Sequence, residues 1–163
     1  MSRHWFAKRR STSFNPPRNM SANHQFCTFY LGEQCFGLDV LKVQEIVRYQ
    51  AITRVPLAHR AVRGLINLRG QIVTALDLRR RLDLPDVDEE YEPVNVVVQS
   101  DDGAVSLLVD EIGDVVEVSE QQFERSPATL QGPARELIHG AYKLPDRLLV
   151  ILDLELIVSL PQR

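Results

Sequence analysis

The chain has 163 residues, 44% of them hydrophobic and 25% charged, a composition typical of a globular protein with one domain or two small lobes. The formal net charge is −3, but residues 1–20 contribute five cationic side chains and no acid, so the remaining residues carry −8. An acidic body lacks the basic surface that nucleic-acid binding requires.

Residues 1–23 are rich in Ser, Asn, Arg and Pro, and they are predicted to form a disordered basic tail. This tail is either a weak electrostatic anchor for lipid or nucleic acid or a dispensable leader.

Two strands are predicted next, at Gln25–Leu31 and Gln34–Val40, because apolar and polar residues alternate there. The same alternation turns Cys27 inward and Cys35 outward, so no disulfide is expected between them. The following segment, Val40–Val47, is predicted to be a short helix that presents Gln44 and Glu45 outward. A strand that begins at Ile46 is the open alternative.

The centre of the chain is the sequence GLINLRGQIVTALDL, residues 64–78. It predicts two core strands joined by a tight turn at Arg69-Gly70, because glycine tolerates the positive φ that such turns require. Asp77 is expected to cap a short helix, in which Arg79, Arg80 and Arg81 form a solvated face.

The second half begins after the acidic stretch Asp83–Pro93, which is the predicted boundary between lobes. Five further strands and a final helix are expected there, at Val94–Gln99, Ala104–Asp110, Val115–Val118, Ile138–Lys143, Leu148–Leu152 and, capped by Asp153, Leu154–Leu160.

Two blocks of sequence recur in the same order. Residues 64–78 match residues 140–154 at an offset of 76, with Leu76-Asp77-Leu78 aligned on Leu152-Asp153-Leu154. At an offset of 69, Phe36, Leu38 and Val40 align on Val105, Leu107 and Val109. The repeat predicts two pseudo-equivalent lobes, at about 24–84 and 94–160 with a linker at 85–93. Short strands and short helices favour an all-β fold of small barrels.

No catalytic constellation is present in the sequence. There is no nucleophile motif, no glycine-rich phosphate loop and no pair of Cys or His with metal-ligand spacing. We therefore expect a binding module that has no enzyme activity, metal or cofactor. No apolar run approaches the ~18 residues that span a bilayer, and no secretory signal is recognisable, so a cytoplasmic location without membrane insertion is expected.

Three motifs, FGLDVLKVQEIV (36–47), GLINLRGQIVTALDLR (64–79) and LLVDEIGDVVEVS (107–119), resemble the CheW family of bacterial chemotaxis coupling proteins. The similarity runs from about Gln25 to Leu160. It implies two five-stranded SH3-like β-barrels that share a hydrophobic core. It also implies a non-catalytic adaptor that joins the regulatory domain of a CheA-type histidine kinase to the cytoplasmic tips of methyl-accepting chemotaxis proteins. The receptor helix is then expected in a groove between the lobes.

Carried onto this chain, the resemblance implies a partner-binding surface at Arg69 and Gly70 of the NLRG motif and at Val43, Gln44 and Glu45 of KVQEI. The basic tail is outside the family pattern, so a paralogue that serves a pilus or gliding array remains an alternative. A β-barrel nucleic-acid binder that uses the tail is a weaker one.

Overall fold

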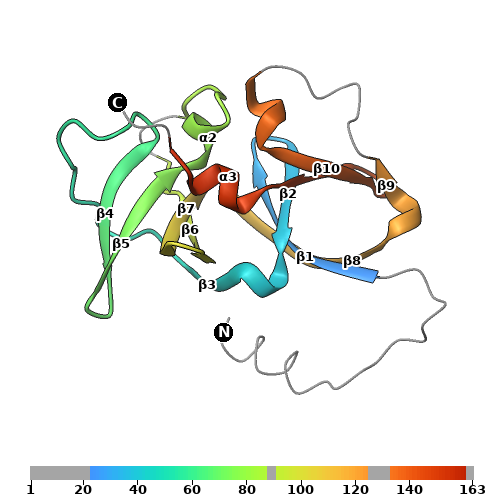
Figure 1. The fold of residues 1–163 in the computed structure, drawn as a ribbon, viewed down its shortest axis with the longest axis horizontal. Helices are drawn as coiled ribbons and strands as arrows, with labels where there is room; N and C mark the ends of the chain where they lie inside the picture. Colours follow the sequence, from blue (N-terminus) through green and yellow to red (C-terminus); the bar gives the residue numbers. More distant parts are fainter. Residues whose placement is uncertain (1–22, 88–90, 125–132, 161–163) are drawn as a thin grey trace.

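The computed structural model describes residues 23–87, 91–124 and 133–160, so the predicted tail lies, except for Asn23, outside the described residues. Within them the chain forms short strands and very short helices (Figure 1). In chain order these are β1 (Asn23–Leu31), β2 (Gln34–Asp39), η1 (Val40–Lys42), β3 (Val43–Val47), β4 (Val62–Leu68), β5 (Gln71–Asp77), α2 (Leu78–Arg81), β6 (Val94–Ser100), β7 (Gly103–Val109), β8 (Glu111–Ser119), η2 (Glu120–Gln122), β9 (Phe123–Glu124), η3 (Pro133–Leu137), β10 (Ile138–Lys143), β11 (Leu148–Leu152) and α3 (Leu154–Val158).

The helix predicted over Val40–Val47 is wrong beyond Lys42. The side chain of Asp39 accepts a hydrogen bond from the Leu41 N–H and caps only the single 3₁₀ turn η1. The β-branched residues that follow instead form β3, which pairs antiparallel with β6.

The described strands form two sheets, which confirms the predicted all-β fold. One has the order β8-β1-β2-β11-β10-β9, and the other has the order β3-β6-β7-β5-β4. The first sheet has a sixth strand, in addition to the expected five, because the two-residue β9 pairs with β10.

The predicted division into consecutive lobes needs correction, because each sheet contains strands from both halves of the chain. The first sheet combines β1 and β2 with β8 to β11, and the second combines β3 to β5 with β6 and β7. The duplicated units are therefore exchanged, and the first two strands of each unit belong to the sheet of the other unit.

The strand register reproduces both sequence offsets. Phe36 lies opposite Val150 where β2 pairs parallel with β11. The residues related to these by the two offsets, Val105 and Thr74, lie opposite each other where β7 pairs parallel with β5. Hydrogen bonds repeat as well, since the Asp77 N–H donates to the Ala61 carbonyl (2.7 Å) and the Asp153 N–H to the Leu137 carbonyl (2.9 Å).

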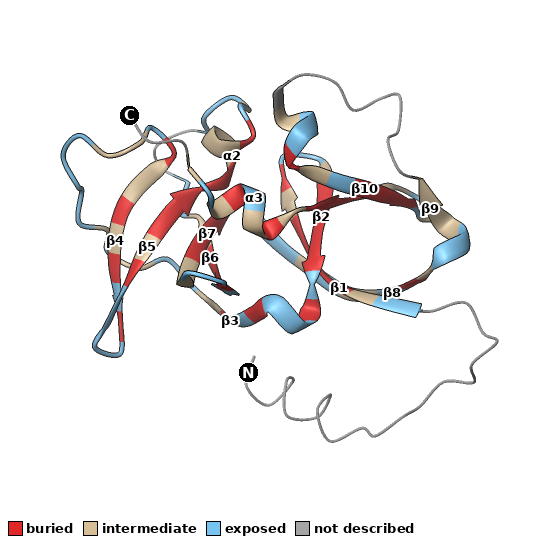
Figure 2. Cartoon of the chain, in the orientation of Figure 1, coloured by how far each residue is buried: buried red, intermediate tan, exposed pale blue. Residues whose placement is uncertain are grey.

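Three buried apolar clusters hold this arrangement together. The largest lies between the sheets and takes residues such as Phe29, Leu76 and Leu107 from both of them. Each sheet also wraps around a smaller cluster of its own. Central strands are consequently buried on both faces (Figure 2). For this reason Cys35, on the face opposite Cys27, is buried as well, and no disulfide joins the two cysteines.

The three arginines of α2 are structural, contrary to the expected solvated face. Arg79 pairs with Asp110, and Arg80 contacts Asp77 and Asp86. Arg81 donates to the carbonyl oxygens of Ile157 and Leu156 (both 2.8 Å) at the end of α3. These bonds tie α2 of one unit to α3 of the other.

Candidate partner-binding site

The hairpin between β4 and β5 has the two-residue turn that the sequence predicts. Leu68 pairs with Gln71, and the two residues between them both have positive φ, 52° at Arg69 and 88° at Gly70. Positive φ at both central positions is the requirement of a type I′ turn. The Asn67 side chain accepts a hydrogen bond from the Gly70 N–H (2.8 Å), which further fixes the tip.

Arg69 reaches from this tip to the opposite edge strand of the same sheet, where it forms an ion pair and hydrogen bond with Glu45 of β3. The Glu45 side chain is 8% exposed, whereas that of Arg69 is 58% exposed. The hydrogen bond and the charge of Glu45 raise the pKa of Arg69. The pair therefore links the two edges of the sheet and leaves much of the guanidinium accessible.

Two of the five predicted site residues lie elsewhere than expected. Val43 is 3% exposed and belongs to the cluster between the sheets, so it is not available to a partner. Glu45 points inward to Arg69 rather than outward. Gln44, Arg69 and Gly70 are exposed. A β-bulge between Val43 and Glu45 turns these two side chains to opposite sides of β3, and both are buried there. Gln44, at the bulge, is exposed.

An apolar groove of about 700 Å³ lies between the two sheets. β3 and β6 of one sheet and β1 and β8 of the other line it. Apolar side chains dominate its surface, with charges only at Arg48 and Asp114, and the lining includes Ile46, Val47 and the partly exposed Ile112. Sequence patterns identified none of these residues, because the groove exists only after the strands of the two units are exchanged.

The hairpin tip and the groove are surfaces suited to binding a partner. In the part of the chain that the structure describes, no group of three or more His, Cys, Asp or Glu side chains is arranged to hold a metal ion. Among the same residues, no helix combines the length and apolar character needed to cross a bilayer.

Two interlocked β-sheets with an apolar groove between them and an exposed charged hairpin are the features of a binding protein. The chain belongs to the CheW-like domain family, whose family model matches residues 25–162. It is 31% identical over 139 residues to the chemotaxis protein CheW of Treponema pallidum, a match that covers 83% of this chain and 82% of that protein. It is 32% identical to chemotaxis protein CheW of Klebsiella aerogenes, where the match covers 85% of this chain and 84% of the relative.

A solved structure agrees with the sequence comparisons. The scaffolding protein TtCheW from Thermoanaerobacter tengcongensis superposes with a TM-score of 0.76 at 26% identity, covering 85% of this chain and 94% of that chain. The chain is accordingly a non-catalytic scaffold of the chemotaxis type, as the sequence motifs predict.

Proposed function

We propose that this scaffold couples the cytoplasmic tips of methyl-accepting chemoreceptors to the regulatory domain of a CheA-type histidine kinase, at membrane-associated receptor arrays in the cytoplasm. The apolar groove between the sheets carries this proposal. The family resemblance implies that a receptor helix lies in a groove between the lobes, and the apolar groove between the two sheets supports this proposal.

The groove suits one amphipathic helix of a receptor. Helix-in-groove recognition uses a row of apolar side chains at i, i+3, i+4 and i+7 against an apolar trough. Ile46 of β3 and Ile112 of β8 flank the groove from different sheets. A helix that contacted both would therefore bridge the two units.

The hairpin tip is the second proposed contact. Arg69 is cationic, more than half exposed and held on a tight turn, and the apolar side chain of Ile72 on the same hairpin is 60% exposed. Arginine beside accessible apolar surface is typical of interface hot spots. Gln44, exposed at the β-bulge of β3, is included in the proposed surface.

Calorimetric titration of the purified chain with a receptor cytoplasmic fragment and with a kinase regulatory domain tests both contacts. Ile112→Glu should weaken receptor binding at least tenfold, whereas Leu156→Glu, which changes another exposed apolar residue (46%) outside the groove, should not. Arg69→Glu should weaken binding of at least one partner, and Lys143→Glu is the charge-matched control on the other sheet. Failure of the unmodified chain to bind either partner at tens of micromolar would contradict the proposal.

A further inference from the structure

The duplicated units place a pocket beside each of the helices α2 and α3, and the two pockets have related linings. The pocket beside α2 (α2 pocket) has a volume of about 700 Å³ and the pocket beside α3 (α3 pocket) about 670 Å³. The offset of 76 relates Asp77 of the first to Asp153 of the second, and both aspartates cap their helices. At the same offset, Arg63 and Arg79 of the α2 pocket correspond to His139 and Glu155 of the α3 pocket.

The segment that precedes β6 forms one side of the α2 pocket. Arg79 donates to the carbonyl oxygen of Pro85 (2.8 Å), and Arg80 pairs with Asp86 (3.3 Å). The hydroxyl of Tyr91 donates to the carbonyl oxygen of Asp110. The acidic segment before β6 therefore lines a basic pocket of the same chain.

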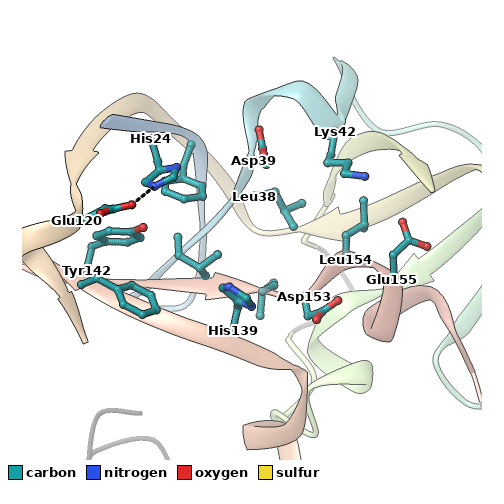
Figure 3. A pocket seen from close by; sticks show the side chains of 14 residues that line it. His24, Leu38, Asp39, Lys42, Glu120, His139, Tyr142, Asp153, Leu154 and Glu155 are labelled. Carbon is teal, nitrogen blue, oxygen red and sulfur yellow. Dashed lines mark ion pairs between the residues drawn. The ribbon is translucent and has the colours of Figure 1, made fainter. Parts of the chain in front are cut away.

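The charge of the α3 pocket is reversed (Figure 3). It is lined by four acids and one lysine, together with two histidines and an apolar wall. The acids are Asp39, Glu120, Asp153 and Glu155, and the lysine is Lys42. The wall includes Phe26, Phe123 and Tyr142, whose neighbouring ring centroids lie 5.1–5.4 Å apart.

Glu155 is the acid in this pocket with an unused oxygen. Its Oε1 accepts a hydrogen bond from the Asp101 N–H (3.3 Å), whereas its buried Oε2 has no hydrogen-bond partner among the described residues. The related bond in the other unit runs from the Gly32 N–H to Asp110 (2.7 Å), and there Arg79 completes the carboxylate. In the α3 pocket the related backbone donor, the Asp101 N–H, bonds to Glu155, which stands at the position of Arg79, and no guanidinium of the described residues pairs with this carboxylate.

We propose that residues 16–22, which precede β1, dock in the α3 pocket and bring the guanidinium of Arg18 to Glu155. The offset of 69 relates residues 16–18 to residues 85–87, which contact or line the α2 pocket. Arg18 is five residues before Asn23, the first residue of β1, and His24 already lines the pocket. Five residues span up to roughly 17 Å when extended, enough to pass along a pocket of this size.

Charge and chemistry both favour this occupant. Residues 1–20 carry five cations and no acid, and the pocket that they would face is acidic. A guanidinium forms strong paired hydrogen bonds with a carboxylate and stacks on aromatic rings, and this pocket supplies both partners.

Two-dimensional NMR of the full chain tests the proposal through residues that are distant from Arg18 in sequence. Arg18→Ala should shift the amide signals of His139, Asp153 and Glu155 and leave those of Arg54 and Arg80, in the α2 pocket, unchanged. Reciprocally, Glu155→Gln should shift the amide of Arg18. Arg10→Ala removes the same charge from the tail eight residues further from the pocket, and it should leave the three pocket signals in place.

Each other outcome would overturn the assignment. Unmoved pocket signals in Arg18→Ala would show that the segment does not dock. Equal shifts in Arg10→Ala would indicate a diffuse field of the tail rather than a site for Arg18. Signals of residues 16–22 that respond only to vesicles of phosphatidylserine and phosphatidylcholine would identify a lipid surface as the occupant instead.

Discussion

Arg69 has two roles that a substitution can separate. Its backbone adopts a positive φ that the hairpin turn requires, and its side chain neutralises a carboxylate that is almost fully buried. Removal of the guanidinium leaves Glu45 unpaired, whereas the turn still depends on Gly70.

We therefore expect Arg69→Ala to remain folded at 25 °C but to melt at a lower temperature than the unmodified chain. Arg69→Ala combined with Glu45→Gln should melt higher than the sum of the two single changes predicts, because the double variant has no unpaired buried charge. Circular dichroism of the four proteins measures this coupling. Strict additivity would show that the ion pair contributes nothing to stability.

The site was only partly predictable at this scale. Glycine after arginine between two apolar runs correctly predicts the turn, because its backbone requirement is local. The burial of Glu45 was not predictable, since its partner is 24 residues away on another strand. A helical interpretation of Val40–Val47 also pointed Glu45 outward, whereas the β-bulge of β3 turns it toward Arg69.

At the scale of elements, β5 is the strand most clearly committed to the core between the sheets. Leu76 is 1% exposed and belongs to that core, whereas Ile72 on the same strand is 60% exposed. Leu76→Ala should lower the free energy of unfolding by about 2–5 kcal/mol, because it removes buried methyl groups and leaves a cavity. Ile72→Ala should change it by less than about 0.5 kcal/mol. Urea unfolding compares the two, and equal effects would contradict the assigned burial of Leu76 and exposure of Ile72.

The bulge at Gly64 is a second element-scale test. Gly64 has a φ of 150°, and a Cβ there would overlap the carbonyl of Thr53, whereas a Cβ at Gly70 would meet open space. Gly64→Ala should therefore cost about 3 kcal/mol or more, and Gly70→Ala only about 1–2 kcal/mol from its positive φ. Differential scanning calorimetry provides the comparison. A smaller loss at Gly64 than at Gly70 would mean that the bulge relaxes freely.

For the molecule as a whole, sequence predicts the duplication but not the exchange of strands. The offsets of 69 and 76 already contain the correct register, because Phe36 and Val150 correspond to Val105 and Thr74. Which unit supplies the partner strand is not encoded in these patterns. Apolar alternation specifies which face of a strand is buried, and both the exchanged and the consecutive arrangement bury the same faces.

The hydrogen bonds of Asp110, which link the two sheets, should make the free energy of unfolding depend on pH in the acidic range. Asp110 accepts hydrogen bonds from Arg79 of α2 and from the Gly32 N–H at the β1–β2 turn, so it joins both sheets. Burial alone would raise the pKa of Asp110, but the hydrogen bonds from Arg79 and Gly32 and the charge of Arg79 hold this pKa below its ordinary value. A carboxyl group whose pKa is lowered by folding binds fewer protons in the native than in the unfolded state. Its stabilising contribution is therefore complete above pH ~4, near the unfolded pKa, and is lost as the pH falls through the native pKa.

We expect the urea midpoint to fall between pH 5 and pH 3, and to fall less steeply in Asp110→Asn, which lacks this titration. Asp146→Asn, which removes a carboxylate that is 72% exposed, should follow the unmodified chain. If Asp110→Asn loses stability as steeply as the unmodified chain, the acid sensitivity arises from other carboxylates and the link across the sheets is not its source.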